Sequence, residues 1–266
     1  MIKLINRSGQ TTAMMALGTV VILGAVGGAF AKKAAIKLTA SAESTDVVTD
    51  LPSPEAHNET IDLAFVTHLD AELPEQDVFI EREPGSGEVW RVTRGDNDMA
   101  APLYKAAKEI HHDPFNPDAL GPHPKGDAMG MNLGDWLRQQ GAGTYSCVDG
   151  VGTLDARFTG LVSEGVYTMW HAFMALPPTT PFSGTLDLPL GARDGSTSEF
   201  RADEEGKASF KHTFQPCLQM SDVWTTSMLA INYHSDGKTY RANPGKFGYN
   251  AHIPLFLMLP PREGIQ

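Results

Sequence analysis

Residues 164–175, with the sequence EGVYTMWHAFMA, decide the fold of this chain. Successive side chains of a β-strand point to opposite faces of its sheet. A strand over Val166–Ala175 would place two rows of side chains on its faces: Tyr167, Met169, His171 and Phe173 on one, and Val166, Thr168, Trp170 and Ala172 on the other. Both rows are largely apolar, so the pattern predicts a central strand that is covered on both faces.

Segments on both sides of this strand also have the length and alternation of strands. They are Thr144–Val148, Thr153–Leu161, Gly184–Leu188, Lys207–Gln215, Ser227–His234 and His252–Leu259. Turn signals such as Asp149-Gly150, Glu164-Gly165 and Asp236-Gly237 separate them. Seven or eight short strands of this kind predict a mainly β fold, an antiparallel β-sandwich over residues 143–260, with a short C-terminal tail over 261–266.

The charge of the chain is concentrated in one segment. The 266 residues carry a net charge of −11, and residues 43–88 hold 13 acidic side chains against the single base Arg82. That window therefore carries −12, and the other 220 residues together carry +1. An acidic chain with a pI of about 5.2 argues against nucleic acid as the main partner.

The N-terminus contains an uncharged apolar segment over residues 11–31. As a helix it would be about 30 Å long, which is the thickness of a bilayer core. Two interpretations compete: a signal peptide cleaved after Ala29-Phe30-Ala31, and an uncleaved signal anchor. We adopt the anchor, with residues 1–10 in the cytoplasm and the bulk of the chain in the periplasm. Gly24 and Gly28 form a GxxxG pattern that favours packing against another transmembrane helix.

The region between the anchor and the predicted sandwich is polar and irregular. Residues 32–60 are basic, then rich in Ser, Thr and Ala, and then acidic, which predicts an extended linker. We expect residues 61–142 to form an extended acidic arm with short helices and a Pro/Gly-rich loop. Within it, the apolar runs Ile61–Leu69 and Glu88–Thr93 are predicted to form a hairpin or to lie on a partner.

Two short helices are predicted in this arm. Residues 99–112 place four apolar side chains on one helical face: Leu103, Ala106, Ala107 and Ile110. A second helix, LGDWLRQQ, would begin after the capping residue Asn132, with Asp135 at its third position, and stop at Gly141. Residues 113–131 hold four prolines and three glycines, which predicts an irregular crossing loop.

Cys147 and Cys217 are the only cysteines of the chain. They lie 70 residues apart near the edges of predicted strands, which in an exported protein favours one disulfide. Closing a loop of that length would stabilise the fold by about 4 kcal/mol in the chain-entropy model. The alternative is two buried thiols.

Several motifs resemble those of uncharacterised exported bacterial proteins with a single β-sandwich domain. They are GMNLGDWL (130–137), GTYSC (143–147), EGVYTMW (164–170), PLGARDGSTSEFRADEEGKASF (189–210), YHSDGKTY (233–240) and GYNAHIPLFLMLP (248–260). The resemblance covers roughly residues 113–260. It implies the sandwich fold and lends no activity.

The sequence contains three groups of possible metal ligands, and none of them predicts a metal site. A blue-copper site needs two His, one Cys and often an axial Met, types that His171, His212, Cys217 and Met220 supply. Here His precedes Cys, whereas cupredoxins present Cys, then His, then Met on one loop. A second group could bind a metal but also fits a solvated helix end: His111, His112, Asp113 and His123. A third group could bind Ca²⁺ but fits a solvated loop better: Asp194, Asp203, Glu204 and Glu205.

No catalytic residues are assigned either. His234, Ser235 and Asp236 bring the triad residue types together, but adjacent residues cannot converge as a nucleophilic triad does. Trp136, Trp170 and Trp224 are expected to be core or interface anchors.

These patterns together predict a non-enzymatic, single-pass accessory subunit of the inner membrane, without a cofactor. It would stabilise a large membrane complex, for example a photosynthetic reaction-centre and antenna complex or a respiratory complex. The expected partners are other membrane subunits, through residues 11–100, and the lipid bilayer. The alternative is a free periplasmic β-sandwich that binds a ligand or a metal, with a cupredoxin less favoured.

Overall fold

The computed structural model describes residues 59–261. The predictions for residues 1–10, 11–31 and 32–58, and for the helix-packing pair Gly24 and Gly28, lie outside the described residues. Within residues 59–261, no helix has the length and apolar character needed to cross a bilayer. The described part is mainly β, and all pairings between its strands are antiparallel.

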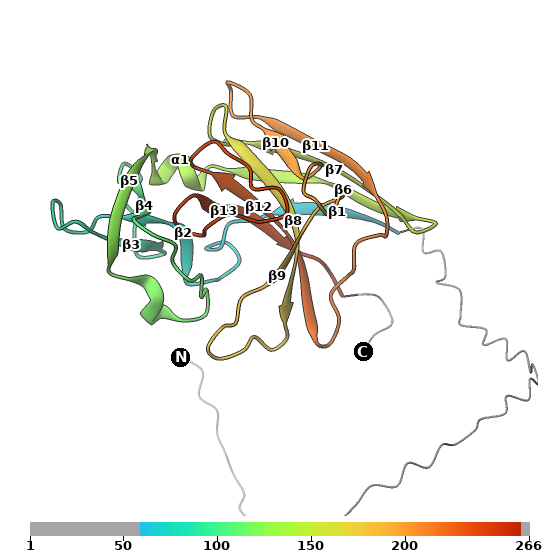
Figure 1. Ribbon diagram of the computed structural model, residues 1–266, viewed down its shortest axis with the longest axis horizontal. Coiled ribbons are helices and arrows are strands. Elements are labelled where there is room, and N and C mark those ends of the chain that lie inside the picture. The colour runs from blue at the N-terminus through green and yellow to red at the C-terminus, as the bar shows by residue number, and fades with distance from the viewer. Residues whose placement is uncertain (1–58, 262–266) are drawn as a thin grey trace, which may run out of the picture. The chain divides into compact units, whose positions relative to one another are not determined.

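Two large sheets account for most of the strands (Figure 1). The first is four-stranded in the order β1 (Glu59–Phe65), β6 (Gln140–Val148), β7 (Val151–Thr159) and β11 (Ala208–Phe214). The second is five-stranded in the order β10 (Glu199–Arg201), β8 (Val166–Ala175), β12 (Thr225–His234) and β13 (Ala251–Met258), and β9 (Leu186–Pro189) also pairs with β8. The strand predicted over Val166–Ala175 is confirmed with the same bounds.

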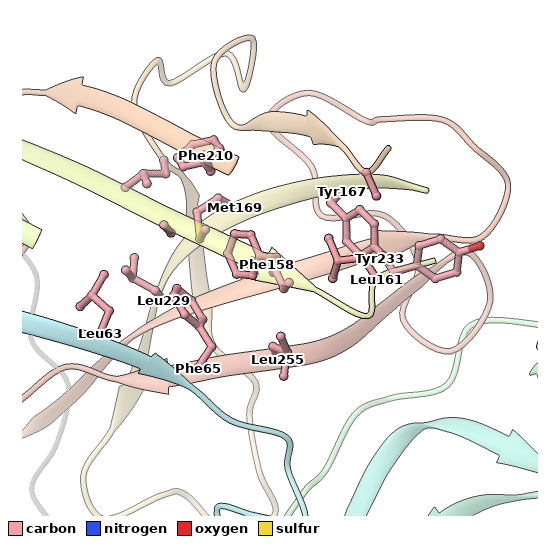
Figure 2. Close-up of a cluster of buried hydrophobic side chains, with 14 of the residues drawn as sticks. Leu63, Phe65, Phe158, Leu161, Tyr167, Met169, Phe210, Leu229, Tyr233 and Leu255 are labelled. Atoms are coloured by element: carbon pink, nitrogen blue, oxygen red, sulfur yellow. The ribbon is translucent and has the colours of Figure 1, made fainter. Parts of the chain in front are cut away.

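The main hydrophobic core is shared by the two sheets. Figure 2 shows Phe158 and Phe210 of the four-stranded sheet beside Met169, Leu229 and Leu255 of the five-stranded sheet. These side chains are buried, and their removal from water is the main stabilising contribution to the fold. Two antiparallel sheets that share one core fit the predicted β-sandwich.

A second, smaller β unit lies beside the sheets (Figure 1). Its four strands close into a barrel: β2 (Glu75–Ile80), β3 (Glu88–Thr93), β5 (His123–Asn132) and β4 (Pro102–Ala106). The helix predicted over 99–112 is therefore wrong, because strand pairing with β2 and β5 overrides its helical spacing. Register shifts in the β4–β5 pair flank Tyr104, and this irregularity allows both Leu103 and Ala106 to be buried.

The extended arm predicted over 61–142 is also not what the structure shows. Its first apolar run forms β1, which pairs along its whole length with β6, for example Ile61 opposite Tyr145. Leu63 and Phe65 of this strand enter the core. No local signal in the sequence predicts this pairing, because the end of β1 and the start of β6 are 75 positions apart.

The Pro/Gly-rich stretch 113–131 is more regular than predicted. It contains a 3₁₀ helix η1 (Pro117–Leu120) and most of β5. The next helix, α1 (Leu133–Leu137), begins as predicted, because the Asn132 side chain accepts from the Asp135 backbone and Asp135 accepts from Asn132 in return. It ends earlier than predicted, since Gly141 belongs to β6. A Cβ atom there would lie 2.5 Å from the Phe158 ring, so the glycine permits close packing instead of ending a helix.

The predicted turn at Asp149-Gly150 joins β6 to β7. Val148 pairs with Val151, which leaves a two-residue loop whose residues both have positive φ, 52° and 77°. This is the type I′ geometry that matches the twist of a hairpin, and Asp-Gly is among its preferred sequences.

The predicted disulfide between Cys147 and Cys217 is present, with 5.8 Å between the two Cα atoms. It ties the end of β6 to the segment that precedes β12. The neighbouring Leu218 backbone donates to the Tyr145 hydroxyl at 2.7 Å, so the crosslinked segment is also held to β6 by a buried hydrogen bond.

Replacing both cysteines, Cys147→Ser with Cys217→Ser, should lower the free energy of unfolding by about 4 kcal/mol, because the unfolded chain regains the freedom of a 70-residue loop. Urea denaturation measures this difference. The wild-type protein in reductant should unfold like the double variant, and reductant should leave the double variant unchanged. Equal midpoints for the oxidised wild type and the double variant would contradict the prediction.

Candidate ligand-binding site

The outer face of the five-stranded sheet carries a hollow. Strand register aligns Asp187, Ala172, Met228 and Met258 in one row across β9, β8, β12 and β13. The next row aligns Trp170, Ala230 and Phe256. Cross-strand neighbours share a face, so the two alanines lie between larger side chains. Their small size leaves space at the centre of this face.

Loops from three parts of the chain wall this hollow. The segments 111–115 and 182–187 contact each other, because His111 Nε2 donates to the Phe182 carbonyl at 3.0 Å and the rings of Phe115 and Phe182 meet edge to face. Phe247 adds a third wall. Together they enclose a cavity of about 270 Å³ that is lined mainly by apolar side chains. Met174, Phe182, Met228 and Phe256 around it form a hydrophobic cluster separate from the main core.

Three histidines, His68, His111 and His112, are among the polar residues of the lining. His68 is 4% exposed, and its ring centroid lies 5.3 Å from that of His112. Burial, together with the neighbouring His112, lowers the pKa of His68 to about 3, so this ring is neutral near pH 7. Its Nδ1 atom is buried and has no hydrogen-bond partner in the described chain.

A buried ionic cluster lies behind His112. Arg91 Nη1 donates to Asp77 Oδ1 at 2.5 Å, and Arg91 Nε lies 3.6 Å from Glu75 Oε2. Arg91, Asp77 and Glu75 are fully buried. Arg91 Nη1 also lies 3.4 Å from His112 Nδ1. A guanidinium only donates, so Nδ1 must accept, and a neutral His112 ring then carries its hydrogen on Nε2.

The two carboxyl groups of this cluster differ in protonation. Burial alone would raise the pKa of Asp77, but the positive charge of the Arg91 guanidinium beside it holds that pKa well below its usual range. For Glu75, burial outweighs the attraction of Arg91 and raises the pKa to about 8. Neither carboxyl oxygen of Glu75 has a hydrogen-bond partner among the described residues. At neutral pH the cluster therefore pairs one arginine with one ionised aspartate and a protonated glutamate.

The residues that the sequence suggested for copper do not form such a site. The sulfur of Cys217 is in the disulfide, which removes the thiolate that a blue-copper centre requires. His171 Nε2 donates to the Ser227 hydroxyl at 2.8 Å, and the His212 ring stacks on Phe214. Met220 is buried in the main core.

The histidine group near residue 112 is also divided. His111 donates to Phe182, and His123 Nε2 donates to the Ala119 carbonyl at 3.0 Å. Asp113 accepts from the Phe115 backbone at 3.2 Å. Over residues 59–261, no three His, Cys, Asp or Glu side chains are grouped so that they could hold a metal ion. His112, which the sequence suggested as a metal ligand, instead lines the cavity.

The adjacent His234, Ser235 and Asp236 point to different partners. His234 Nε2 lies 2.9 Å from the Thr168 hydroxyl, whereas Ser235 bonds His252 and Asp236 accepts from Tyr240. The Ser235–His252 pair was not predicted, but His252 is fully buried and neither residue lines the cavity.

The acidic loop residues and the tryptophans also find clear roles. Asp194 accepts from Ser196, and Asp203 accepts from the Lys207 backbone, as turn-capping residues do. Trp136 and Trp170 are buried as expected, and Trp170 lines the cavity. Trp224 is 75% exposed, so it is not part of the core.

Sequence reasoning missed His68, Asp187 and the two alanines of the cavity floor. The alternation of β8 already placed Trp170 and Ala172 on one face, and this small–large pattern was the available signal for a hollow. No local pattern around His68 or Asp187 indicates that they meet at this face. Comparison of the chain with family models, curated proteins and solved structures gives no match.

Replacing the buried glutamate, Glu75→Gln, should flatten the pH dependence of stability above pH 6.5. In the wild type the Glu75 carboxyl loses its proton at about pH 4.3 in the unfolded state and only at about pH 8 in the folded state. The free energy of unfolding therefore falls as the pH rises between these values. The fall between pH 6.5 and 8.5 should be about 2 kcal/mol.

Urea unfolding at several pH values measures this slope. The control Glu83→Gln changes an exposed glutamate between β2 and β3 and should keep the wild-type slope. The histidines with lowered pKa values, such as His68, change stability below pH 6.5 and so do not obscure the window. A Glu75→Gln slope equal to that of the wild type would show that Glu75 is ionised in the folded protein.

Proposed function

We propose that this protein binds a small, largely apolar ligand in the cavity on the outer face of its five-stranded sheet. The observation that carries the proposal is the cavity itself, about 270 Å³ among mainly apolar side chains with three imidazoles in its lining. Protein interiors leave few voids larger than a water molecule, so a hollow of this size needs a specific arrangement of residues. An apolar hollow with a few polar groups is the usual form of a ligand site.

The lining suits ligands of variable shape. Met174, Met228 and Met258 contribute flexible, polarizable side chains that adapt to irregular surfaces. Trp170 and Phe182 add rigid aromatic walls. The volume fits a compact molecule better than a long lipid chain.

Binding is favoured over catalysis by the state of the polar groups. The Thr185 hydroxyl of the lining donates to Asp187, and Ser183 accepts from Thr179. Neither hydroxyl bonds a histidine that could activate it as a nucleophile. We therefore keep the proposal of a non-enzymatic protein, which corresponds to the free ligand-binding alternative of the sequence analysis.

Filling the hollow with Ala230→Phe should weaken binding of a neutral apolar fluorophore, N-phenyl-1-naphthylamine, at least tenfold. The new ring would occupy the cavity floor between Trp170 and Phe256. Fluorescence titration measures the dissociation constant, and circular dichroism confirms that each variant is folded.

The matched control is Ala175→Phe, because Ala175 is an exposed residue at the end of the neighbouring strand β8 and does not line the cavity. It should bind the fluorophore like the wild type. If folded Ala230→Phe protein also binds like the wild type, the fluorophore binds elsewhere and the proposal fails.

A second candidate function is the membrane-anchored periplasmic accessory subunit, and one observation favours it. Four of the exposed large apolar side chains lie on β9 or on the segments that follow β8 and precede β12: Leu176 is exposed by 41%, Leu186 by 62%, Val223 by 52% and Trp224 by 75%. The Leu176 backbone donates to the Trp224 carbonyl at 2.8 Å, so two of these loops are adjacent. Figure 1 shows β9 and the loop before β12 projecting from the same side of the domain. Exposed apolar residues that gather in this way are typical of protein contacts.

On this proposal the surface formed by Leu176, Leu186, Val223 and Trp224 contacts another subunit. The segment 11–31 anchors the chain in the inner membrane. The double variant Trp224→Ser with Leu186→Ser should lose co-migration with its partners when the full chain is purified from native membranes in mild detergent. Val148→Ser, at the exposed β6–β7 hairpin, is the matched control and should co-migrate normally. Wild-type protein that migrates alone, or a mature chain that begins at Lys32, would rule the proposal out.

A further inference from the structure

We infer that the cavity binds a hydrophobic organic cation, an ammonium group on a compact apolar body, with Asp187 as its counter-ion. This inference rests on the proposed ligand-binding function and adds the chemical class of the ligand. It follows from which charged groups line the cavity, how Asp187 is held, and what surrounds it.

The charges at the cavity are of one sign. Asp187 is its one lining carboxylate within the described part of the chain, and the lining there includes no lysine or arginine. Behind the histidines, Arg91 is paired with Asp77, and Glu75 is protonated at neutral pH. An anionic ligand would therefore meet Asp187 with no lysine or arginine of the lining to pair with. A cationic ligand would meet an unpaired carboxylate.

Asp187 is positioned to face such a ligand. It lies on β9 opposite Ala172, so its side chain shares the outer face of the sheet with the cavity floor. Its Oδ1 atom accepts from the Thr185 hydroxyl at 2.6 Å. Its Oδ2 atom makes no hydrogen bond to any residue of the described chain, which leaves one carboxylate oxygen for a ligand N–H.

The surroundings of Asp187 also favour a cation. Burial raises the pKa of Asp187, against the opposing effects of the Thr185 hydroxyl and His112. A buried carboxylate of this kind gains most from a cation placed beside it. His68 does not compete for the carboxylate as a cation, since its ring is neutral near pH 7.

Aromatic side chains complete the site. The rings of Trp170, Phe115 and Phe182 line the cavity. Ammonium groups are attracted to the faces of aromatic rings, most strongly to tryptophan, and the attraction grows when the cation is removed from water. The methionines of the floor would contact the apolar body.

Three ligands with the same apolar body test the inference: hexylamine, 1-hexanol and hexanoate. Each is titrated against the complex of N-phenyl-1-naphthylamine with the full-length protein at pH 8, and displacement of the fluorophore is measured. At this pH an alkylamine is protonated, because its pKa is about 10.4, like that of lysine. The wild type should bind hexylammonium at least tenfold more tightly than hexanol, and hexanoate most weakly. Asp187→Asn should weaken hexylammonium at least tenfold and change hexanol binding less than twofold.

Asp149→Asn is the matched control, because it makes the same exchange at the exposed β6–β7 turn, where either residue tolerates a positive φ. It should keep the wild-type order of affinities. If hexanol or hexanoate binds the wild type as tightly as hexylammonium, or if Asp187→Asn keeps the preference for the amine, the cation inference is overturned and the apolar site stands. If none of the three ligands displaces the fluorophore, and Ala230→Phe does not weaken the fluorophore, both proposals fail.

Discussion

The fully buried ion pair between Arg91 and Asp77 connects the parts of this structure. Arg91 lies on β3 and Asp77 on β2, both in the small barrel. Asp77 also reaches the large sheet, because its Oδ2 accepts from the Ile253 backbone at 3.2 Å and its carbonyl accepts from His252 Nδ1 at 3.0 Å. Removing one partner of a buried pair leaves an uncompensated charge at a cost of about 3–5 kcal/mol. The barrel and the sheet are therefore held in one arrangement.

That arrangement determines the candidate site. The segment that follows β4 leaves the barrel and runs over the outer face of the five-stranded sheet, where His111 and Phe115 meet Phe182. Arg91 orients the His112 ring at the wall of the cavity. The floor depends on a different constraint, since Ala172 and Ala230 must stay small for the hollow to exist. Packing within the sheet sets the shape of the site, and the buried ion pair sets the position of its cover.

Local signals in the sequence predicted the parts of the fold that local chemistry controls. Both rows of β8 are apolar, Asp149-Gly150 suits a type I′ turn, and Asn132 with Asp135 forms a capping box; each was found where the sequence placed it. Strand β1 and the barrel were missed because their stability comes from partners far along the chain. The site was missed for the same reason, since His68 and Asp187 are distant in sequence and meet only through the sheet and its loops.

The structure changes the meaning of the acidic segment. The acids over 43–88 were expected to belong to an extended linker and arm, but several of them make contacts within the fold. Glu75 and Asp77 surround Arg91, and Glu81 pairs with Lys125 of β5 at 2.6 Å. Asp70 accepts from Thr67 in the loop after β1. These contacts are made within residues 59–261, so this part of the charge does not require a partner protein to explain it. The negative charge that favours a cation at the cavity comes instead from Asp187, which lies outside the segment 43–88.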